Sequence, residues 1–81
     1  MTIKYFGYYK KKAGKAEESY IAQRSISDMM TELTKYLKRE YDILPPFAVL
    51  VDGEHILSAQ KKQMILDGGE VIKIIPHISG G

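Results

Sequence analysis

The most regular pattern in the sequence is a set of apolar residues at helical spacing in the middle of the chain. They follow one another at steps of four, three, four and four, which places them on one side of a helix: Ile26, Met30, Leu33, Leu37 and Tyr41. Ser27 suits the helix start because a serine oxygen caps backbone N–H groups, and a carboxylate is favourable at Asp28. Pro45-Pro46 cannot continue a helix. We therefore predict one amphipathic helix from about residue 26 that ends before these prolines.

Segments on both sides of this helix are rich in β-branched and aromatic residues. They predict strands at residues 3–9, 17–22, 47–51, 54–57 and 70–75. The lysine-rich stretch 10–16 contains Gly14 and is predicted to be a turn, and Asp52-Gly53 is typical of a two-residue hairpin. Residues 58–66 fit a connector with room for one helical turn, and Pro76 is expected to end the last strand.

The order of these elements predicts the fold class. A single helix after a hairpin must bury its apolar stripe against a sheet, which gives a two-layer α+β domain. If the first and last strands are parallel neighbours, they need a crossover, and the helix lies between them in sequence. We predict a β-grasp, or ubiquitin-like, domain: a mixed sheet of four to five strands on one main helix. It would occupy residues 1–76 and carry a flexible tail of residues 77–81.

Composition narrows the functional classes. The 81 residues fit one domain, and the absence of cysteine excludes disulfides, thiolate metal sites and a thiol nucleophile. The sequence shows no signal-peptide pattern and no apolar run long enough to cross a membrane, so a cytoplasmic domain without a membrane partner is expected. The net charge is only +2, and the lysines at 10–12 are interpreted as a solvated turn rather than a nucleic-acid patch.

The candidate chemistry lies at the end of the sequence, in Gly80 and Gly81. At ordinary glycine frequency such a pair closes a chain by chance about once in 200. Because glycine lacks a Cβ, this tail can thread a narrow channel and present the terminal carboxylate to an enzyme's buried site. His55 and His77 are isolated, so no metal site is expected.

The sequence resembles the molybdopterin synthase small subunit family along almost its whole length. The most specific part is the segment 66–71 (Leu-Asp-Gly-Gly-Glu-Val), followed by Pro76 and the ending 79–81 (Ser-Gly-Gly). The opening 3–7 (Ile-Lys-Tyr-Phe-Gly), with Ala-Gly-Lys shortly after it, and the segment 49–53 (Val-Leu-Val-Asp-Gly) resemble the family's first strand and middle hairpin.

The sequence departs from the family pattern in three places. Gly69 replaces a second Asp, His77 replaces a second Pro, and the lysines at 10–12 stand where many members carry an Arg-Glu pair. These departures leave the chemistry of the terminus in place and bear on which partner is used.

This resemblance implies a sulfur carrier that is not itself an enzyme. A ubiquitin-activating-type adenylyltransferase would consume ATP to adenylate the Gly81 carboxylate, and a sulfur donor enzyme would convert it to a thiocarboxylate. The carrier would then dock on the molybdopterin synthase large subunit and deliver sulfur to the pterin precursor of the molybdenum cofactor. Catalytic side chains would belong to these partners, and no bound cofactor is implied.

Docking requires an exposed apolar patch near the root of the tail. The resemblance implies Phe6, His55 and Ile75 as partner-binding residues, with Ile78 as an anchor within the tail. For Phe6 and Ile75 the alternative is an ordinary core position, since strand alternation alone does not say which face is buried.

Three other functions remain open from the sequence. The chain could carry sulfur for another pathway, such as thiamin synthesis or tRNA thiolation. It could be a ubiquitin-like modifier whose Gly81 is joined to lysines of other proteins. It could also be a simple binding module with no use for its tail.

Overall fold

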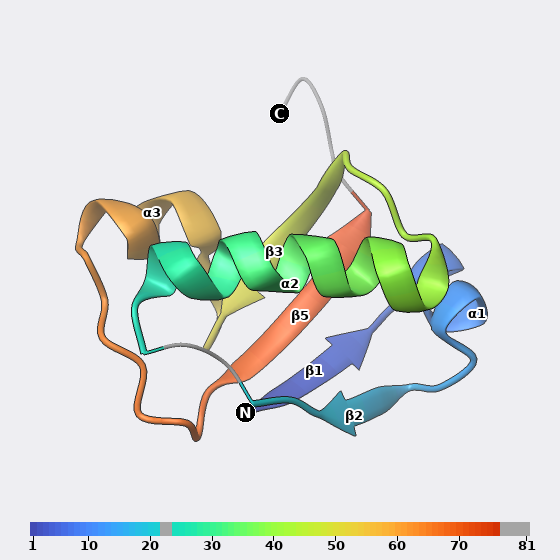
Figure 1. The fold of residues 1–81 in the computed structure, drawn as a ribbon, viewed down its shortest axis with the longest axis horizontal. Coiled ribbons are helices and arrows are strands. Elements are labelled where there is room, and N and C mark those ends of the chain that lie inside the picture. The colour runs from blue at the N-terminus through green and yellow to red at the C-terminus, as the bar shows by residue number, and fades with distance from the viewer. Residues whose placement is uncertain (22–23, 77–81) are drawn as a thin grey trace.

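The computed structural model describes residues 1–21 and 24–76. A five-stranded mixed sheet lies behind one long helix, α2, and two short helices flank it (Figure 1). The elements in chain order are β1 (Thr2–Tyr5), α1 (Tyr8–Ala13), β2 (Glu17–Ser19), α2 (Ile26–Tyr41), β3 (Phe47–Val51), β4 (Glu54–His55), α3 (Ile56–Lys61) and β5 (Val71–Pro76).

The strand order in the sheet is β2-β1-β5-β3-β4. The first and last strands, β1 and β5, are parallel neighbours, with Ile3 opposite Ile72, and all other neighbouring strands are antiparallel. The helix α2 forms part of the crossover that this parallel pair requires. This is the β-grasp arrangement, so the predicted fold class is confirmed, and the parallel pairing considered for the first and last strands is observed.

The helix α2 ends where its sequence predicts but begins with a different cap. The side chain of Ser25, not Ser27, accepts a hydrogen bond from the backbone N–H of Asp28 at 3.4 Å. Asp42 ends the helix in the left-handed conformation, before the two prolines. Met29 is fully buried and Met30 only half-buried, so the apolar stripe is rotated slightly from the predicted one.

The predicted turn at residues 10–16 and the predicted strand at 3–9 are wrong in part, because α1 occupies residues 8–13. Gly7 has φ +56°, and the chain leaves the strand there. Tyr9 and Ala13 then bury one side of the short helix against the core, and Gly14, in the left-handed conformation, ends it. Tertiary packing therefore selects a helix in a stretch whose lysines and glycine favour a turn.

The second hairpin is also shorter than predicted. Only Glu54 and His55 pair back onto β3, and Ile56 begins α3 instead of extending the strand. Burial of Ile56 and Ala59 explains the change, since helical spacing places both in the core. The strand β5 runs through Pro76.

The strand β2 is held to the rest of the fold by a carboxylate surrounded by tyrosines. Glu18 accepts hydrogen bonds from the hydroxyl groups of Tyr5 at 2.5 Å, Tyr41 at 2.6 Å and Tyr36 at 2.7 Å. The ammonium of Lys15 lies 3.7 Å from Oε1 of the same carboxylate. Because these partners come from β1, α2 and the loop before β2, Glu18 joins both layers of the domain.

Burial and hydrogen bonding act on the pKa of Glu18 in opposite directions. Burial alone would raise it, but the hydrogen bonds from Tyr41, Tyr5 and Tyr36 outweigh burial and hold the pKa below its ordinary value of 4.5. Burial, with the hydrogen bond to Glu18, raises the pKa of the Tyr5 hydroxyl. The cluster therefore holds an ionised carboxylate and neutral phenols at physiological pH.

Candidate docking face and root of the tail

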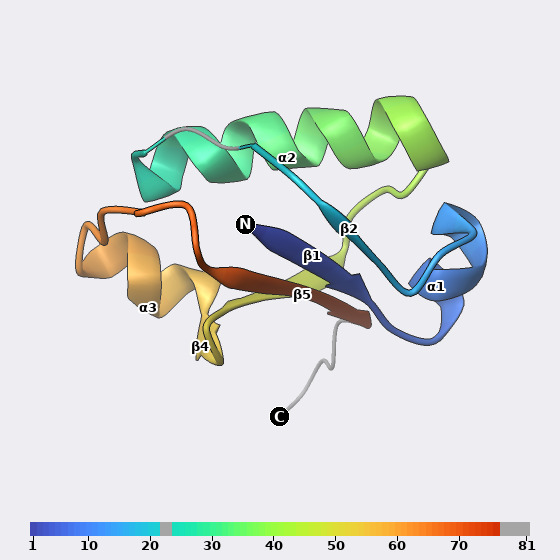
Figure 2. The same cartoon turned by 90° about the horizontal axis from the view of Figure 1, so that it is seen from below.

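The two faces of the sheet differ in what covers them. Figure 2 shows α2 on one side, with α1 and α3 at the two ends of the sheet. Ile72 and Ile74 of β5 point into the core, so Val71, Lys73 and Ile75 face the other way and are half-buried. We call this second surface the open face, and in the three central strands strand alternation places on it Thr2, Lys4, Ala48, Leu50, Val71, Lys73 and Ile75.

The strand register places two of the predicted docking residues near one end of the open face. Ile75 pairs opposite Ala48 on β3 and is not a core residue. Phe6 follows directly after β1 and is 40% exposed, so it is not a core residue either. The β1–β5 register ends with Tyr5 opposite Ile74, which places Phe6 and Ile75 next along the same pair of strands.

The third predicted residue, His55, lies apart from this pair. It stands on the edge strand β4 opposite Leu50, and its Nδ1 accepts a hydrogen bond from the backbone N–H of Leu57 at 3.1 Å. That bond caps α3, so the ring has a local structural role. Ile78, Gly80 and Gly81 lie outside the described residues.

The surface near the end of β5 includes an exposed aromatic residue that sequence reasoning did not assign to docking. Pro76 pairs opposite Phe47, whose ring packs edge-to-face on Tyr9 at 6.2 Å between centroids. Tyr8 packs on Tyr9 in turn and is 61% exposed. Only the existence of α1 brings Tyr8 here, and the sequence pattern did not predict that helix.

The start of β5 is fixed by a compact turn. The buried Glu70 carboxylate accepts the backbone N–H groups of Asp67 at 2.7 Å and Gly68 at 3.0 Å. The Asp67 carboxylate accepts the N–H of Gly69 at 2.8 Å, and this bond lowers the pKa of Asp67. The most family-specific internal motif thus has a structural role, since it sets the strand that leads to the tail.

A second contact holds the same strand from the neighbouring hairpin. Asp52 Oδ1 accepts the N–H of Val71 at 2.8 Å, and the N–H of Asp52 donates to the Val71 carbonyl at 2.9 Å. The strand β5 is therefore hydrogen-bonded to β1 and β3 along its length and tied down at its first residue.

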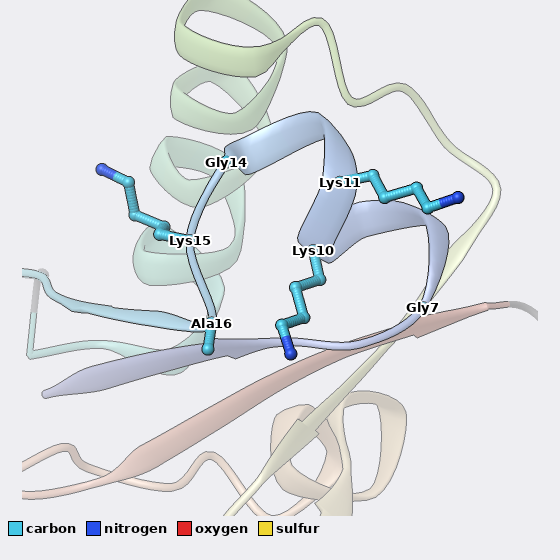
Figure 3. A pocket seen from close by; sticks show the side chains of 6 residues that line it. All are labelled: Gly7, Lys10, Lys11, Gly14, Lys15 and Ala16. Carbon is cyan, nitrogen blue, oxygen red and sulfur yellow. The ribbon is translucent and has the colours of Figure 1, made fainter.

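Lysines of α1 and of the loop after it border a surface hollow of about 610 Å³, shown in Figure 3. The side chains of Lys10, Lys11 and Lys15 point in three different directions from its rim. Lys15 also pairs with Glu18 at 3.7 Å. The hollow therefore lacks a point where ammonium groups meet around an anion.

Within residues 1–21 and 24–76, no cluster of three or more histidine, aspartate or glutamate side chains could hold a metal ion. Within the same part of the chain, no helix has the length and apolar character that crossing a membrane requires.

Solved structures with the same fold cover nearly the whole chain. The small archaeal modifier protein 1 (SAMP1) of Methanosarcina acetivorans is 24% identical, with a TM-score of 0.66, over 99% of this chain and 94% of its own. Urm1 of Sulfolobus solfataricus is 18% identical, with a TM-score of 0.67, over 95% of this chain and 100% of its own. SAMP1 of Haloferax volcanii is 20% identical, with a TM-score of 0.60, over 100% of this chain and 98% of its own. No curated protein matches the chain significantly.

The mixed sheet, its single covering helix and the central strand that leads to the tail define a ubiquitin-like β-grasp protein. The chain matches the ThiS family over residues 3–81 and belongs to that family. It is therefore a small ubiquitin-like protein of the sulfur-carrier type. Proteins of this type are generally not catalysts themselves and work with activating enzymes.

Proposed function

We propose that this protein carries sulfur as a thiocarboxylate on Gly81 and serves as the small subunit of molybdopterin synthase. The observation that carries the proposal is the placement of β5. This strand is held between β1 and β3, is tied at its start by Asp52 and Glu70, and borders an open apolar face as it approaches the tail. Such a scaffold presents the chain end to another protein and needs no catalytic side chain of its own.

The chemistry begins at the terminal carboxylate, which is a poor electrophile. One of its oxygens attacks the α-phosphorus of ATP on the activating enzyme, pyrophosphate leaves, and an acyl-adenylate forms. Hydrosulfide supplied by the donor enzyme then attacks the carbonyl carbon, a C–S bond forms, AMP leaves, and loss of the S–H proton gives the thiocarboxylate. The thiocarboxylate sulfur then attacks an electrophilic carbon of the pterin precursor. Water cleaves the resulting thioester at its carbonyl carbon, which leaves the sulfur on the precursor and restores the Gly81 carboxylate.

The open face supports the docking step of this proposal. Phe6 and Ile75 lie together on it, and neither is used by the core. The long helix α2 covers the other face of the sheet, so the open face is the one on which a partner can dock. We assign the region around these two residues to contact with the activating enzyme and the synthase large subunit.

The test of the carrier chemistry is intact-mass analysis. The full chain is incubated with the adenylyltransferase of the same organism, ATP and hydrosulfide as the sulfur source. We expect the mass change that replaces one oxygen by one sulfur, and we expect none for a chain that lacks Gly81. A wild-type chain that stays unmodified while the enzyme releases no pyrophosphate would overturn the proposal.

The pathway is tested separately with the thiocarboxylated protein. Mixed with the molybdopterin synthase large subunit and the pterin precursor, it should form the dithiolene product in a single turnover. Sulfur transfer to a tRNA or a thiazole precursor, with none to the pterin, would leave the carrier chemistry standing and replace the pathway.

Protein modification is the second candidate, and the likeness to SAMP1 and Urm1 favours it over the remaining alternatives. The same acyl-adenylate can be attacked by a lysine amine, which gives an isopeptide bond. In cells that express the tagged chain, this predicts high-mass adducts that disappear when Gly81 is deleted. Adducts without any thiocarboxylate would favour the modifier, and the reverse would favour the carrier.

A further inference from the structure

The centre of the open face holds a cation in an apolar setting. Lys73 lies on β5 directly between Lys4 of β1 and Leu50 of β3. The residues before and after it on the same face of its own strand are Val71 and Ile75. The side chain of Lys73 therefore projects from the sheet between apolar neighbours, and one other lysine stands beside it.

The pairing of the two lysines is unfavourable by itself. Like charges directly opposite each other in a sheet destabilise it. Glu17 stands opposite Lys4 on the other side, at the sheet edge. Within residues 1–21 and 24–76, neither Lys4 nor Lys73 forms an ion pair with a carboxylate, that of Glu17 included.

Several lysines of the described chain form no ion pair but are exposed to water, whereas Lys73 is half-buried; other lysines have a carboxylate partner. Lys12 pairs with Asp42 at 3.7 Å, and Lys62 pairs with Glu54. A cation without such a pair becomes costly when a partner covers it, because burying an ammonium without an opposite charge carries a large desolvation penalty. A protein that docks on the open face must therefore supply the carboxylate.

We infer that Lys73, with Lys4 beside it, is the electrostatic anchor of the docking face. Its partner is the adenylyltransferase that activates Gly81, which presents an aspartate or glutamate to Lys73 from within an apolar surface. This inference rests on the proposed function and deepens it. Contact with Ile75 buries apolar surface on binding. The buried ion pair sets the position in which the partner docks, and it disfavours surfaces that lack a carboxylate.

A nucleic-acid partner fits this surface less well. Phosphate backbones are bound by many cations spread along a groove, whereas here two cations stand in an apolar frame. The lysines of α1 do not add a common centre, since their side chains point in different directions (Figure 3).

The experiment is calorimetric binding of the full chain to the purified adenylyltransferase of the same organism, without ATP. Three variants test the anchor: Lys73→Glu, Lys73→Ala and Lys73→Arg. The matched control is Lys38→Glu, which makes the same charge change at an exposed position on α2, away from the open face. Thermal melts of all variants establish that each is folded before binding is compared.

We expect Lys73→Ala to weaken binding about tenfold or more and Lys73→Glu to weaken it further, as loss of one partner of a buried ion pair does. Lys73→Arg should retain most of the affinity, and Lys38→Glu should match the wild type. The affinity of the wild type should fall with added salt more steeply than that of Lys73→Ala.

The outcomes separate the anchor from the proposed function. Binding that depends on Lys73 without any adenylation would support the anchor and overturn the carrier chemistry. Normal adenylation with equal affinities for Lys73→Glu and Lys38→Glu would overturn the anchor and leave the carrier chemistry intact. Failure of the wild type to bind the adenylyltransferase, or tight binding to RNA that Lys73→Glu abolishes, would overturn the anchor as well.

Discussion

Glu18 and Lys73 are charged residues in opposite situations. Glu18 lies between the two layers and accepts hydrogen bonds from the hydroxyls of Tyr5, Tyr36 and Tyr41. Lys73 lies on the open face and has no ion-pair partner among residues 1–21 and 24–76. The first charge is satisfied within the fold and holds it together, whereas the second needs a partner from outside.

The comparison separates stability from recognition in this small domain. Side chains on the α2 side of the sheet determine whether the chain folds, and those on the open face determine what it meets. Substitutions on the two sides should therefore affect different measurements.

Deletion of Gly81 should abolish adenylation and leave the fold unchanged. The reacting carboxylate moves back by one residue, while the domain of residues 1–76 keeps all its contacts. Pyrophosphate release by the activating enzyme measures the first effect, and a thermal melt of the free protein measures the second. A large drop in melting temperature would contradict the separation of scaffold and tail.

Leu33→Ala should destabilise the domain by about 2–5 kcal/mol, because it removes a fully buried side chain of α2. Denaturant unfolding measures this loss. The folded fraction should still bind the activating enzyme with the affinity of the wild type. Weaker binding by fully folded protein would show that the two faces are not independent.

Glu18→Ala should cost about 1–3 kcal/mol, because three tyrosine hydroxyls lose their shared acceptor. Denaturant unfolding gives the value, and Glu17→Ala, an exposed neighbour on the same strand, serves as the control. Equal stability of the two variants would mean that the tyrosine cluster does not hold β2.

The contribution of Glu18 should depend on pH in one direction. Its pKa is lower in the folded protein than its ordinary value of 4.5, so its ionised form is favoured by folding. The contribution is then complete above pH 4.5 and declines as the pH falls through the folded-state pKa. Unfolding curves of the wild type and Glu18→Ala should therefore converge in acid, and a constant difference would contradict this assignment.

Lys73→Gln should have the smallest effect on the free protein, a gain of about 0.2–1 kcal/mol from removal of the like charge beside Lys4. The gain should shrink when salt is added, because salt screens exposed charges. Denaturant unfolding at low and high salt provides the measurement. A clear loss of stability would mean that Lys73 has an internal partner.

The sequence predicted the fold where pattern and tertiary packing agree. The strand 47–51 and the helix start near residue 26 match the structure, because their apolar spacing is also the spacing of the core. The helix α1 was missed because Tyr9 and Ala13 are its only buried residues, and only the sheet beneath them makes the helix favourable. The change from strand to helix at Ile56 was missed for the same reason, because α3 also has only two buried residues and depends on tertiary packing.

The site was predictable to a similar extent. The family resemblance suggested Phe6 and Ile75 as docking residues. Strand alternation alone does not say which face of the sheet is buried, so only the observed register places them on the open face. The role of Lys73 could not be read from the sequence, because only the pairing of β5 with β1 brings it beside Lys4. Gly80, Gly81 and Ile78 remain predictions from the sequence.

The central position of β5 also determines how the domain bears mechanical load. Force applied by a partner enzyme to the chain end would act along the strand axis, and β5 is hydrogen-bonded to β1 on one side and β3 on the other. Such a force must shear both ladders together instead of peeling one bond at a time. A central strand of this kind should resist a pull on the chain end better than an edge strand would.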